Sequence, residues 1–265
     1  MEQAIDATRL TGEFIDKARR LVDEAGFAGP PINPRKLAWM CGVQRIVLSN
    51  GLEVSGQLLR QGGELVIRLN AKESPERQNF SCCHEIAHTF AFDHCFGTLH
   101  ETGEARRCSG SSIEERLCDR AAAEMLMPEK FFRSLAMKLE PSIASLTCLS
   151  KAFTASIMAT VLRLGQLATW PVVFIGWRFT AGFESVPKLR VSWSVRPVGS
   201  RCFVPRHATA DRSSGMYATF TASHPTYDVE VLNLGSLRGK YPVESARLGS
   251  SVVSIVHDVR PRRRA

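Results

Sequence analysis

The feature that most constrains this chain is the pentapeptide His84-Glu85-Ile86-Ala87-His88. On an α-helix, residues four positions apart lie on one face about one turn apart, so the two imidazoles can approach a single metal ion. Glu85, between them, can reach the open side of that ion. Zinc hydrolases use this arrangement together with a third protein ligand and a position left for water. The pentapeptide therefore predicts a zinc-binding helix in which His84 and His88 are ligands and Glu85 is a general base.

The flanking residues favour a helix that packs against a core. Ser74 fits the N-cap position, and Pro75 suits the first helical turn. Phe80, Ile86 and Phe90 then supply an apolar face beside the histidines. The alternative is a buried helix whose histidines only hydrogen-bond to neighbours, but that reading leaves the glutamate between them unexplained.

His94 is one candidate for the third ligand. It lies ten residues after His84, which is the spacing of a longer zinc motif. That motif needs a glycine three residues after the second histidine so that the chain can turn back toward the metal. Ala91 occupies this position here and favours continuing the helix, so His94 stays an alternative.

A carboxylate from residues 113–128 is the favoured third ligand. This segment reads as a second helix closed by proline. Glu115 and Asp119 share one of its faces, so Glu115 can bind the metal while Asp119 accepts the other ring N–H of a ligating histidine. Glu114 is a further alternative for the ligand. It points about 100° away around the helix, so both glutamates are not expected to face the metal.

Three segments resemble the ImmA/IrrE family of metallo-endopeptidases. Residues 80–88 read Phe-Ser-Cys-Cys-His-Glu-Ile-Ala-His, and residues 115–128 read Glu-Arg-Leu-Cys-Asp-Arg-Ala-Ala-Ala-Glu-Met-Leu-Met-Pro. Residues 18–37 are similar to the first helices of that family. The family usually has Leu-Ala where this chain has Cys82-Cys83, and glycine where it has Ala87, but none of these positions is a ligand.

The resemblance implies a zincin-like peptidase domain with one Zn²⁺ per chain. It makes His84, His88 and Glu115 the metal ligands and Glu85 the catalytic base, in agreement with the reading of the residues themselves. It also implies a protein substrate, namely a DNA-bound transcriptional repressor of the helix-turn-helix class. Cleavage of that repressor would derepress genes under stress or during transfer of mobile DNA.

The whole chain is expected to be an α+β protein in three parts. Residues 1–130 would form the zinc metallopeptidase domain, built from helices and a short antiparallel sheet. Residues 131–168 would form a helical, helix-turn-helix-like segment. Residues 169–265 would form a C-terminal α+β domain with a sensory or regulatory role and a basic tail. The helices of the first part are predicted over 8–25 and 34–40, and its strands over 45–48, 54–59 and 64–69.

The sheet of the first part is expected to serve the peptidase site. Gln61-Gly62-Gly63 is a hairpin signal between the last two strands. An edge strand can hold an extended peptide by main-chain hydrogen bonds. We expect residues 64–69 to be that edge strand.

The helix-turn-helix-like segment is predicted to pack rather than to read DNA. Its turn falls near residues 153–155, and a DNA-reading helix after it should expose Arg, Lys, Asn or Gln. The chain instead offers Ile157, Met158, Val161 and Leu162 there. Base readout stays the alternative.

Composition bounds the compartment and the partners. With 265 residues, 44% of them hydrophobic, the chain can form one large or two modest domains with a real core. No apolar run approaches the about 18 residues of a membrane span, and no signal-peptide pattern is present, so we expect a cytoplasmic protein with no membrane partner. Among the eight cysteines, Cys82 and Cys83 are adjacent on a helix, which disfavours a disulfide framework and favours a packing role.

The net charge of +8 lies partly in the tail at residues 260–264. A basic surface can contact DNA nonspecifically or attract an acidic protein, although solvated surface charge is the commoner explanation.

Two other classes of function remain open. One is a metal-dependent transcriptional regulator or sensor that acts by DNA or protein binding without proteolysis. The other is a scaffold whose zinc is a structural staple, with His94 or His100 closing a four-ligand shell.

Overall fold

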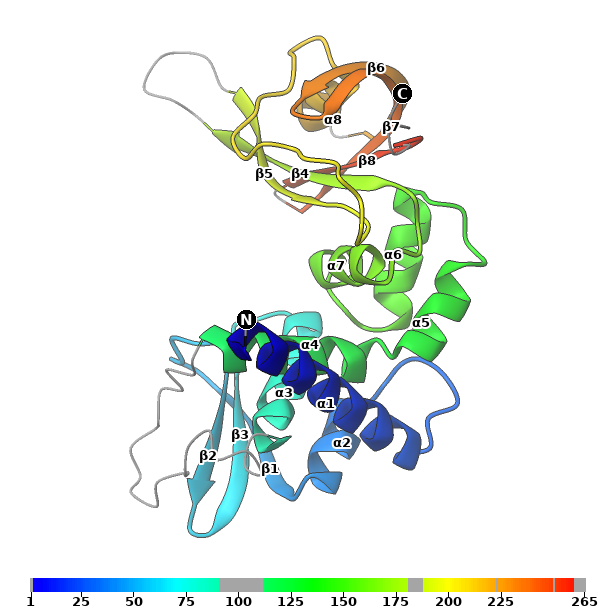
Figure 1. Cartoon of the computed structure of the whole chain (residues 1–265). Helices are drawn as coiled ribbons and strands as arrows, with labels where there is room; N and C mark the ends of the chain where they lie inside the picture. The colour runs from blue at the N-terminus through cyan, green and yellow to red at the C-terminus, as the bar shows by residue number, and fades with distance from the viewer. Residues whose placement is uncertain (1, 91–111, 181–187, 223, 250, 260–265) are drawn as a thin grey trace. The chain divides into compact units, whose positions relative to one another are not determined.

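The computed structural model describes residues 2–90, 112–180, 188–222, 224–249 and 251–259 (Figure 1). Within these ranges the chain forms eight helices and two sheets, so the α+β class predicted from the sequence is confirmed. The chain divides into two compact units. One comprises Met1–Phe132 with Ser150–Ala159, and the other Arg133–Leu149 with Thr160–Ala265. The three-part division expected from the sequence stays a prediction.

Four helices of the first unit frame its core. They are α1 (Glu2–Glu24), α2 (Pro34–Met40), α3 (Pro75–Phe90) and α4 (Ser112–Leu126). The apolar face of α1 that carries Phe14, Ala18 and Val22 is buried. The Phe14 ring meets the Phe90 ring edge to face, with 5.9 Å between centroids. Such packing of α1 against α3 fixes the helix that carries the histidines.

The sheet of the first unit is mixed rather than antiparallel. Its strands are β1 (Val43–Ser49), β2 (Gly56–Gln61) and β3 (Glu64–Asn70), in the order β1-β3-β2. β2 pairs with β3 antiparallel, through a turn in which Gly62 and Gly63 both have positive φ, as the hairpin signal predicted. β1 pairs with β3 in parallel, so the expectation of a purely antiparallel sheet was wrong.

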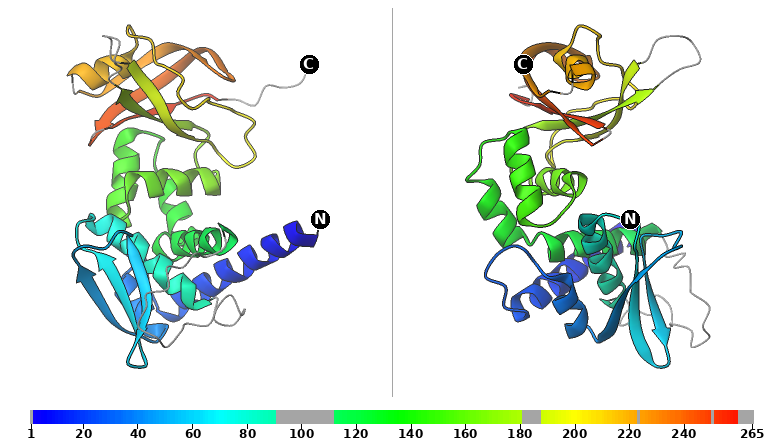
Figure 2. Two further views of the ribbon diagram at one scale, coloured as in Figure 1. Left: turned by 90° about the vertical axis from the view of Figure 1, so that its left-hand side faces the viewer. Right: turned by 180° about the vertical axis from the view of Figure 1, so that it is seen from behind.

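β3 is the central strand, so the expectation that residues 64–69 form an edge was also wrong. Leu65, Val66 and Ile67 are all buried, although consecutive side chains of a strand point to opposite faces. A strand covered on both faces carries a continuous apolar run of this kind. The edges are β1 and β2, and β2 lies beside α3 (Figure 2).

α3 begins as the sequence predicted. The Ser74 hydroxyl accepts a hydrogen bond from the backbone N–H of Arg77 at 3.3 Å, and Pro75 is the first helical residue. Ile86 and Ala87 are fully buried on the side of the helix that packs into the unit. The remaining face is free to present the histidines to α4.

Three further helices follow α4, and two of them form the helix-turn-helix-like segment. They are α5 (Glu129–Ala136), α6 (Ile143–Ala152) and α7 (Ile157–Leu167). α6 and α7 meet at 102°, and Thr154 in their turn has φ of 49°, a conformation that usually selects glycine. Arg163 of α7 is 3% exposed, so its guanidinium is not presented for base contact.

Among the described residues, no single helix is both long and apolar enough to cross a membrane. Only α6 and α7 taken together meet that test, as a pair bent by 102°.

The second unit is built on a five-stranded antiparallel sheet in the order β5-β4-β8-β7-β6. Its strands are β4 (Val173–Thr180), β5 (Lys188–Val195), β6 (Thr226–Leu234), β7 (Leu237–Leu248) and β8 (Ser251–Val256). α8 (Gly215–Ala222) packs on β6 and β7. Trp177 is fully buried in the core, where its indole N–H donates to the Ser254 hydroxyl at 2.9 Å.

Candidate metal centre

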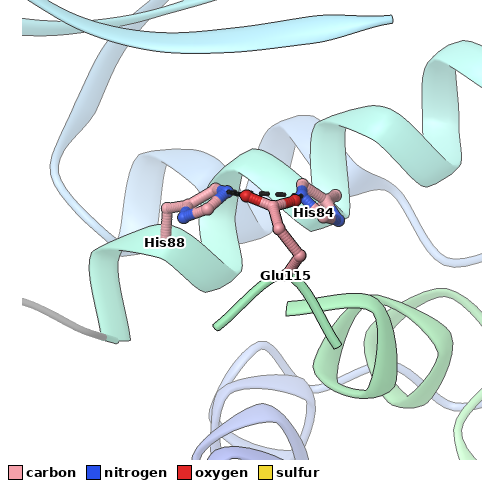
Figure 3. A group of neighbouring side chains, drawn as sticks. All are labelled: His84, His88 and Glu115. Atoms are coloured by element: carbon pink, nitrogen blue, oxygen red, sulfur yellow. Dashed lines mark hydrogen bonds and ion pairs between the residues drawn. The ribbon is translucent and has the colours of Figure 1, made fainter. Parts of the chain in front are cut away.

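His84, His88 and Glu115 converge between α3 and α4 (Figure 3). Each offers one ligand atom, and these atoms all lie within 4.8 Å of one another. Nε2 of His84 is 3.2 Å from Nε2 of His88 and 3.2 Å from Oε2 of Glu115. Nε2 of His88 is 3.9 Å from Oε1 of the same carboxylate. Two imidazole nitrogens and a carboxylate are a donor set that holds divalent metals such as zinc.

The outer nitrogen of each imidazole has a carboxylate partner. Nδ1 of His84 lies 3.0 Å from Oδ1 of Asp119, the contact that the sequence predicted for this residue. Nδ1 of His88 lies 3.1 Å from Oε1 of Glu114. When Nδ1 donates its proton to a carboxylate, the lone pair of Nε2 is left available to a metal ion. The two contacts therefore orient both rings toward Glu115.

Glu114 is placed neither as a metal ligand nor pointing away from the site. The sequence reading had it as an alternative metal ligand that would otherwise point away from the site. Its side chain is 12% exposed and reaches the outer nitrogen of His88, while Glu115 occupies the inner side. The pair of adjacent glutamates thus contacts both sides of the histidine pair.

The charge balance of the group also fits a cation. Burial alone would lower the pKa of His84, but hydrogen bonds to Asp119 and Glu115 outweigh it and raise that pKa to about 10. The hydrogen bond to His84 in turn lowers the pKa of Glu115. Glu85, Glu114, Glu115 and Asp119 place four carboxylates around two imidazoles that are neutral when they bind metal. This excess of negative charge favours a divalent ion at the centre.

Glu85 lies beside the three candidate ligands without belonging to them. It is 6% exposed, and burial raises the pKa of its carboxyl group above the ordinary value. The backbone N–H of Leu58 in β2 donates a hydrogen bond to this carboxylate. The carboxylate therefore lies between the histidines of α3 and the edge strand of the sheet.

None of the other described residues named from the sequence joins the donor set. His94 and His100 lie outside the described residues. Cys82 and Cys83 are buried, and burial raises the pKa of the Cys82 thiol to about 12, as expected of thiols that fill space. Cys118, whose Sγ is 3.6 Å from Nδ1 of His88, is a contact that the sequence reading missed.

Comparison with known proteins gives a match that includes this centre. Residues 51–165 match a peptidase family described as the IrrE N-terminal-like domain. The radiation response metalloprotease IrrE of Deinococcus radiodurans is 31% identical over 111 residues, which cover 41% of this chain and 33% of that protein. IrrE of Deinococcus deserti is 30% identical over 111 residues, 41% of this chain and 39% of that protein. The chain thus spans well under half the length of these curated relatives.

One solved structure extends the likeness to nearly the whole chain. A transcriptional regulator of Mycobacterium tuberculosis superposes with a TM-score of 0.60 over 97% of this chain and 94% of that chain, at 15% identity. At that identity the likeness concerns the fold alone.

Proposed function

From the match of residues 51–165 to the IrrE N-terminal-like peptidase family, we propose that the chain is a zinc-dependent endopeptidase. The observation that carries the proposal is the convergence of His84, His88 and Glu115, with Glu85 beside them on the same helix as the histidines. A structural zinc site needs a fourth protein ligand, whereas a catalytic one keeps a position open. Within the part of the chain that the structure describes, three ligands with an adjacent, non-liganding carboxylate support the catalytic assignment.

His84, His88 and Glu115 would hold the ion, with Asp119 and Glu114 keeping the two rings in position. Bound zinc would acidify a water molecule and polarise the carbonyl of the scissile bond. Glu85 would accept the proton of the attacking water and deliver it to the nitrogen of the leaving amine. Its burial and its hydrogen bond from Leu58 hold the carboxylate beside the histidines.

We assign the binding of the substrate to β2, an edge strand of the sheet. β2 is an edge strand, and its Leu58 N–H already contacts the Glu85 carboxylate, so a peptide added to this edge would run past the base. Edge strands bind extended peptides through main-chain hydrogen bonds, which tolerate many sequences.

The substrate that we propose is a transcriptional repressor of the helix-turn-helix class, whose cleavage in the cytoplasm would release its genes under stress. Support comes from the relatives in Deinococcus, which are named radiation response metalloproteases. The second unit, with its five-stranded sheet, is then a candidate for sensing the signal.

Comparing new N-termini tests the proposal. Zinc-loaded wild type and Glu85→Gln would each be incubated with protein extract from the source cells, and newly formed N-termini would be labelled and identified by mass spectrometry. Both proteins should bind one zinc per chain, but only wild type should generate new termini, some of them in DNA-binding repressors. The rate at which new termini form should be at least about 100-fold lower with Glu85→Gln, which is the lower end of what a general base contributes.

Two results would contradict this reading in different ways. If both proteins formed the same set of new termini, Glu85 would not be the catalytic base. If zinc-loaded wild type formed no new termini, the chain would not be an endopeptidase. Sequence-specific DNA binding that is insensitive to Glu85→Gln would then favour a regulator that acts without proteolysis.

A further inference from the structure

We propose that Gly56 is a positioning residue for the Glu85 carboxylate, and that the missing side chain at the start of β2 is what leaves this carboxylate its place. This inference rests on the proposed peptidase function in so far as it concerns the rate of cleavage. Its geometric part, the effect of position 56 on Glu85, can be measured without any substrate.

Space, not backbone conformation, explains the glycine. A Cβ at position 56 would lie 2.8 Å from Oε1, 3.1 Å from Cγ and 3.3 Å from Cδ of Glu85. In proteins, Cβ atoms essentially never come within 3.0 Å of a non-bonded heavy atom. Gly62 and Gly63 of the same sheet have φ of 58° and 85°, which favour glycine for conformational reasons, but Gly56 is not among the glycines with positive φ. At Gly56 the three nearest atoms that a Cβ would meet all belong to the Glu85 side chain.

β2 contacts the Glu85 carboxylate at a second point. Two residues after Gly56, the backbone N–H of Leu58 donates a hydrogen bond to it. The side chain is 6% exposed, so it has little room to swing into solvent. A carboxylate held by one strand residue and accommodated by another has its position set by the register of β2 along α3.

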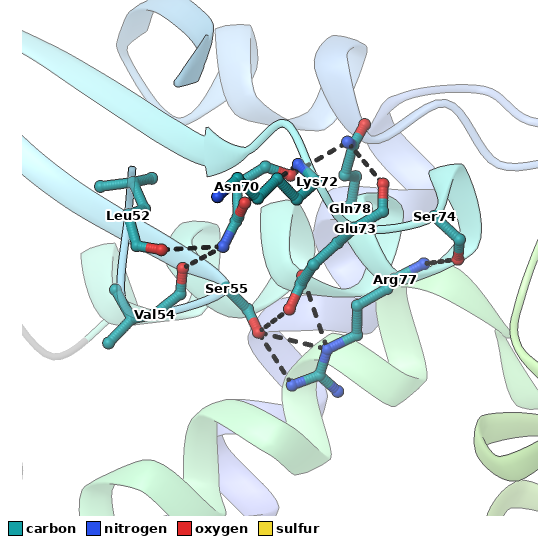
Figure 4. A network of polar contacts seen from close by, with 9 residues as sticks. All are labelled: Leu52, Val54, Ser55, Asn70, Lys72, Glu73, Ser74, Arg77 and Gln78. Atoms are coloured by element: carbon teal, nitrogen blue, oxygen red, sulfur yellow. Dashed lines mark hydrogen bonds and ion pairs between the residues drawn. The ribbon is translucent and has the colours of Figure 1, made fainter. Parts of the chain in front are cut away.

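A polar network fixes that register (Figure 4). The hydroxyl of Ser55, the residue before Gly56, donates to Oε1 of Glu73 at 2.7 Å and accepts from Nη2 of Arg77 at 3.1 Å. Arg77 belongs to α3, the helix that carries Glu85. α3 thus holds the chain at Ser55, directly before β2, and the Glu85 side chain of the same helix rests against Gly56.

Asn70 secures the chain on the other side of Ser55. Its side-chain amide donates to the carbonyl oxygens of Leu52 at 3.0 Å and Val54 at 3.3 Å. Its backbone N–H donates to the carbonyl oxygen of Ser55 at 3.0 Å. These bonds hold the segment between β1 and β2 where it crosses the end of β3. The start of β2 is therefore fastened from both the sheet and the helix, and Gly56 cannot retreat from Glu85.

An alanine at position 56 must then displace the carboxylate and not the strand. The atoms that the new Cβ meets all belong to the Glu85 side chain, which can turn about its own bonds, whereas the start of β2 is fastened on both sides. A catalytic group moved by about 1 Å can lose on the order of 100-fold in rate. The expected signature is a large loss of catalysis in a protein that is folded and binds metal normally.

The test compares Gly56→Ala with Gly12→Ala, a matched control in α1 where an added Cβ meets nothing within 4 Å. The substrate is a synthetic peptide spanning a bond that the wild type cuts in the N-terminus experiment. Gly56→Ala should lower kcat about 100-fold and change KM by less than about threefold, with one zinc per chain and a melting temperature within a few degrees of wild type. Gly12→Ala should match wild type in kcat and KM.

Crystal structures of zinc-loaded wild type and Gly56→Ala provide the readout that does not depend on activity. The variant should show the Glu85 carboxylate displaced from its wild-type position, with β2 and the three ligands unmoved. An unmoved carboxylate, or a shifted β2 with Glu85 in place, would overturn the inference even if cleavage fell. If wild type cuts nothing, the peptidase proposal fails, and the structures alone decide whether Gly56 positions Glu85.

Discussion

The two carboxylates on the outer nitrogens should differ in their effect on zinc affinity. Removing such a partner from a metal-binding histidine typically costs 10- to 100-fold in affinity. Glu114→Ala should fall near the upper limit and Asp119→Ala near the lower. The reason is burial, since the Glu114 side chain is 12% exposed and that of Asp119 is 58% exposed.

The magnitudes follow from how well water can replace each carboxylate. Asp119 contacts His84 from a position open to solvent, so a water molecule can take its place and screening already weakens the contact. Glu114 contacts His88, whose side chain is 7% exposed, so its removal leaves a ring N–H without easy access to water. We expect about 10-fold for Asp119→Ala and about 100-fold for Glu114→Ala, or roughly 1.4 and 2.7 kcal/mol of binding free energy.

Competition with a fluorescent zinc chelator at one ionic strength and pH would measure both affinities. Glu76→Ala is the matched control, because it removes a glutamate from α3 eight residues, or roughly 12 Å, before His84. It should change the affinity less than about twofold. Equal losses for the two variants, or a greater loss for Asp119→Ala, would refute the argument from burial.

Two further substitutions probe the ligand set and the helix that carries it. Glu115→Ala leaves two imidazoles as the candidate ligands among the described residues, so the variant should not retain zinc on dialysis; retention of one zinc per chain by elemental analysis would exclude Glu115 as a ligand. Phe14→Ala removes a fully buried ring that packs on Phe90 of α3, and urea unfolding should show a loss of about 3–5 kcal/mol. A loss below about 1 kcal/mol would mean that this contact does not anchor α3.

Local signals in the sequence were sufficient for most of the first unit. The helix predicted over 34–40 has the observed bounds of α2, and Ser74 and Pro75 identified the start of α3. Such signals reside within one or two turns of chain. The order of strands in a sheet depends on residues far apart in the sequence, and the predicted position of residues 64–69 at the edge of the sheet was wrong. β1 and β2 are neighbours in sequence but lie at opposite edges, because the segment between them crosses the end of β3 and is held there by Asn70.

The second unit shows a different limit. Residues 205–241 carry no clear periodic signal in the sequence, yet they include α8, β6 and the start of β7. β6 exposes Val229 and Val231 and buries Leu232 and Leu234, so its apolar residues do not keep one phase of alternation. β7 contains Pro242 although it lies between β6 and β8, where a proline argues against a strand.

Glu114 illustrates why a helix-face argument can mislead at a metal centre. The angle of about 100° between adjacent residues describes where side chains leave the helix, and it excludes both glutamates only if they share one target point. Here the targets differ. Each imidazole presents two nitrogens on opposite sides of its ring, and Glu115 meets the inner ones while Glu114 reaches Nδ1 of His88. A helix that crosses a histidine pair can thus use adjacent carboxylates for two tasks, so the sequence signal for such a centre is the pair of glutamates together with an aspartate four residues later.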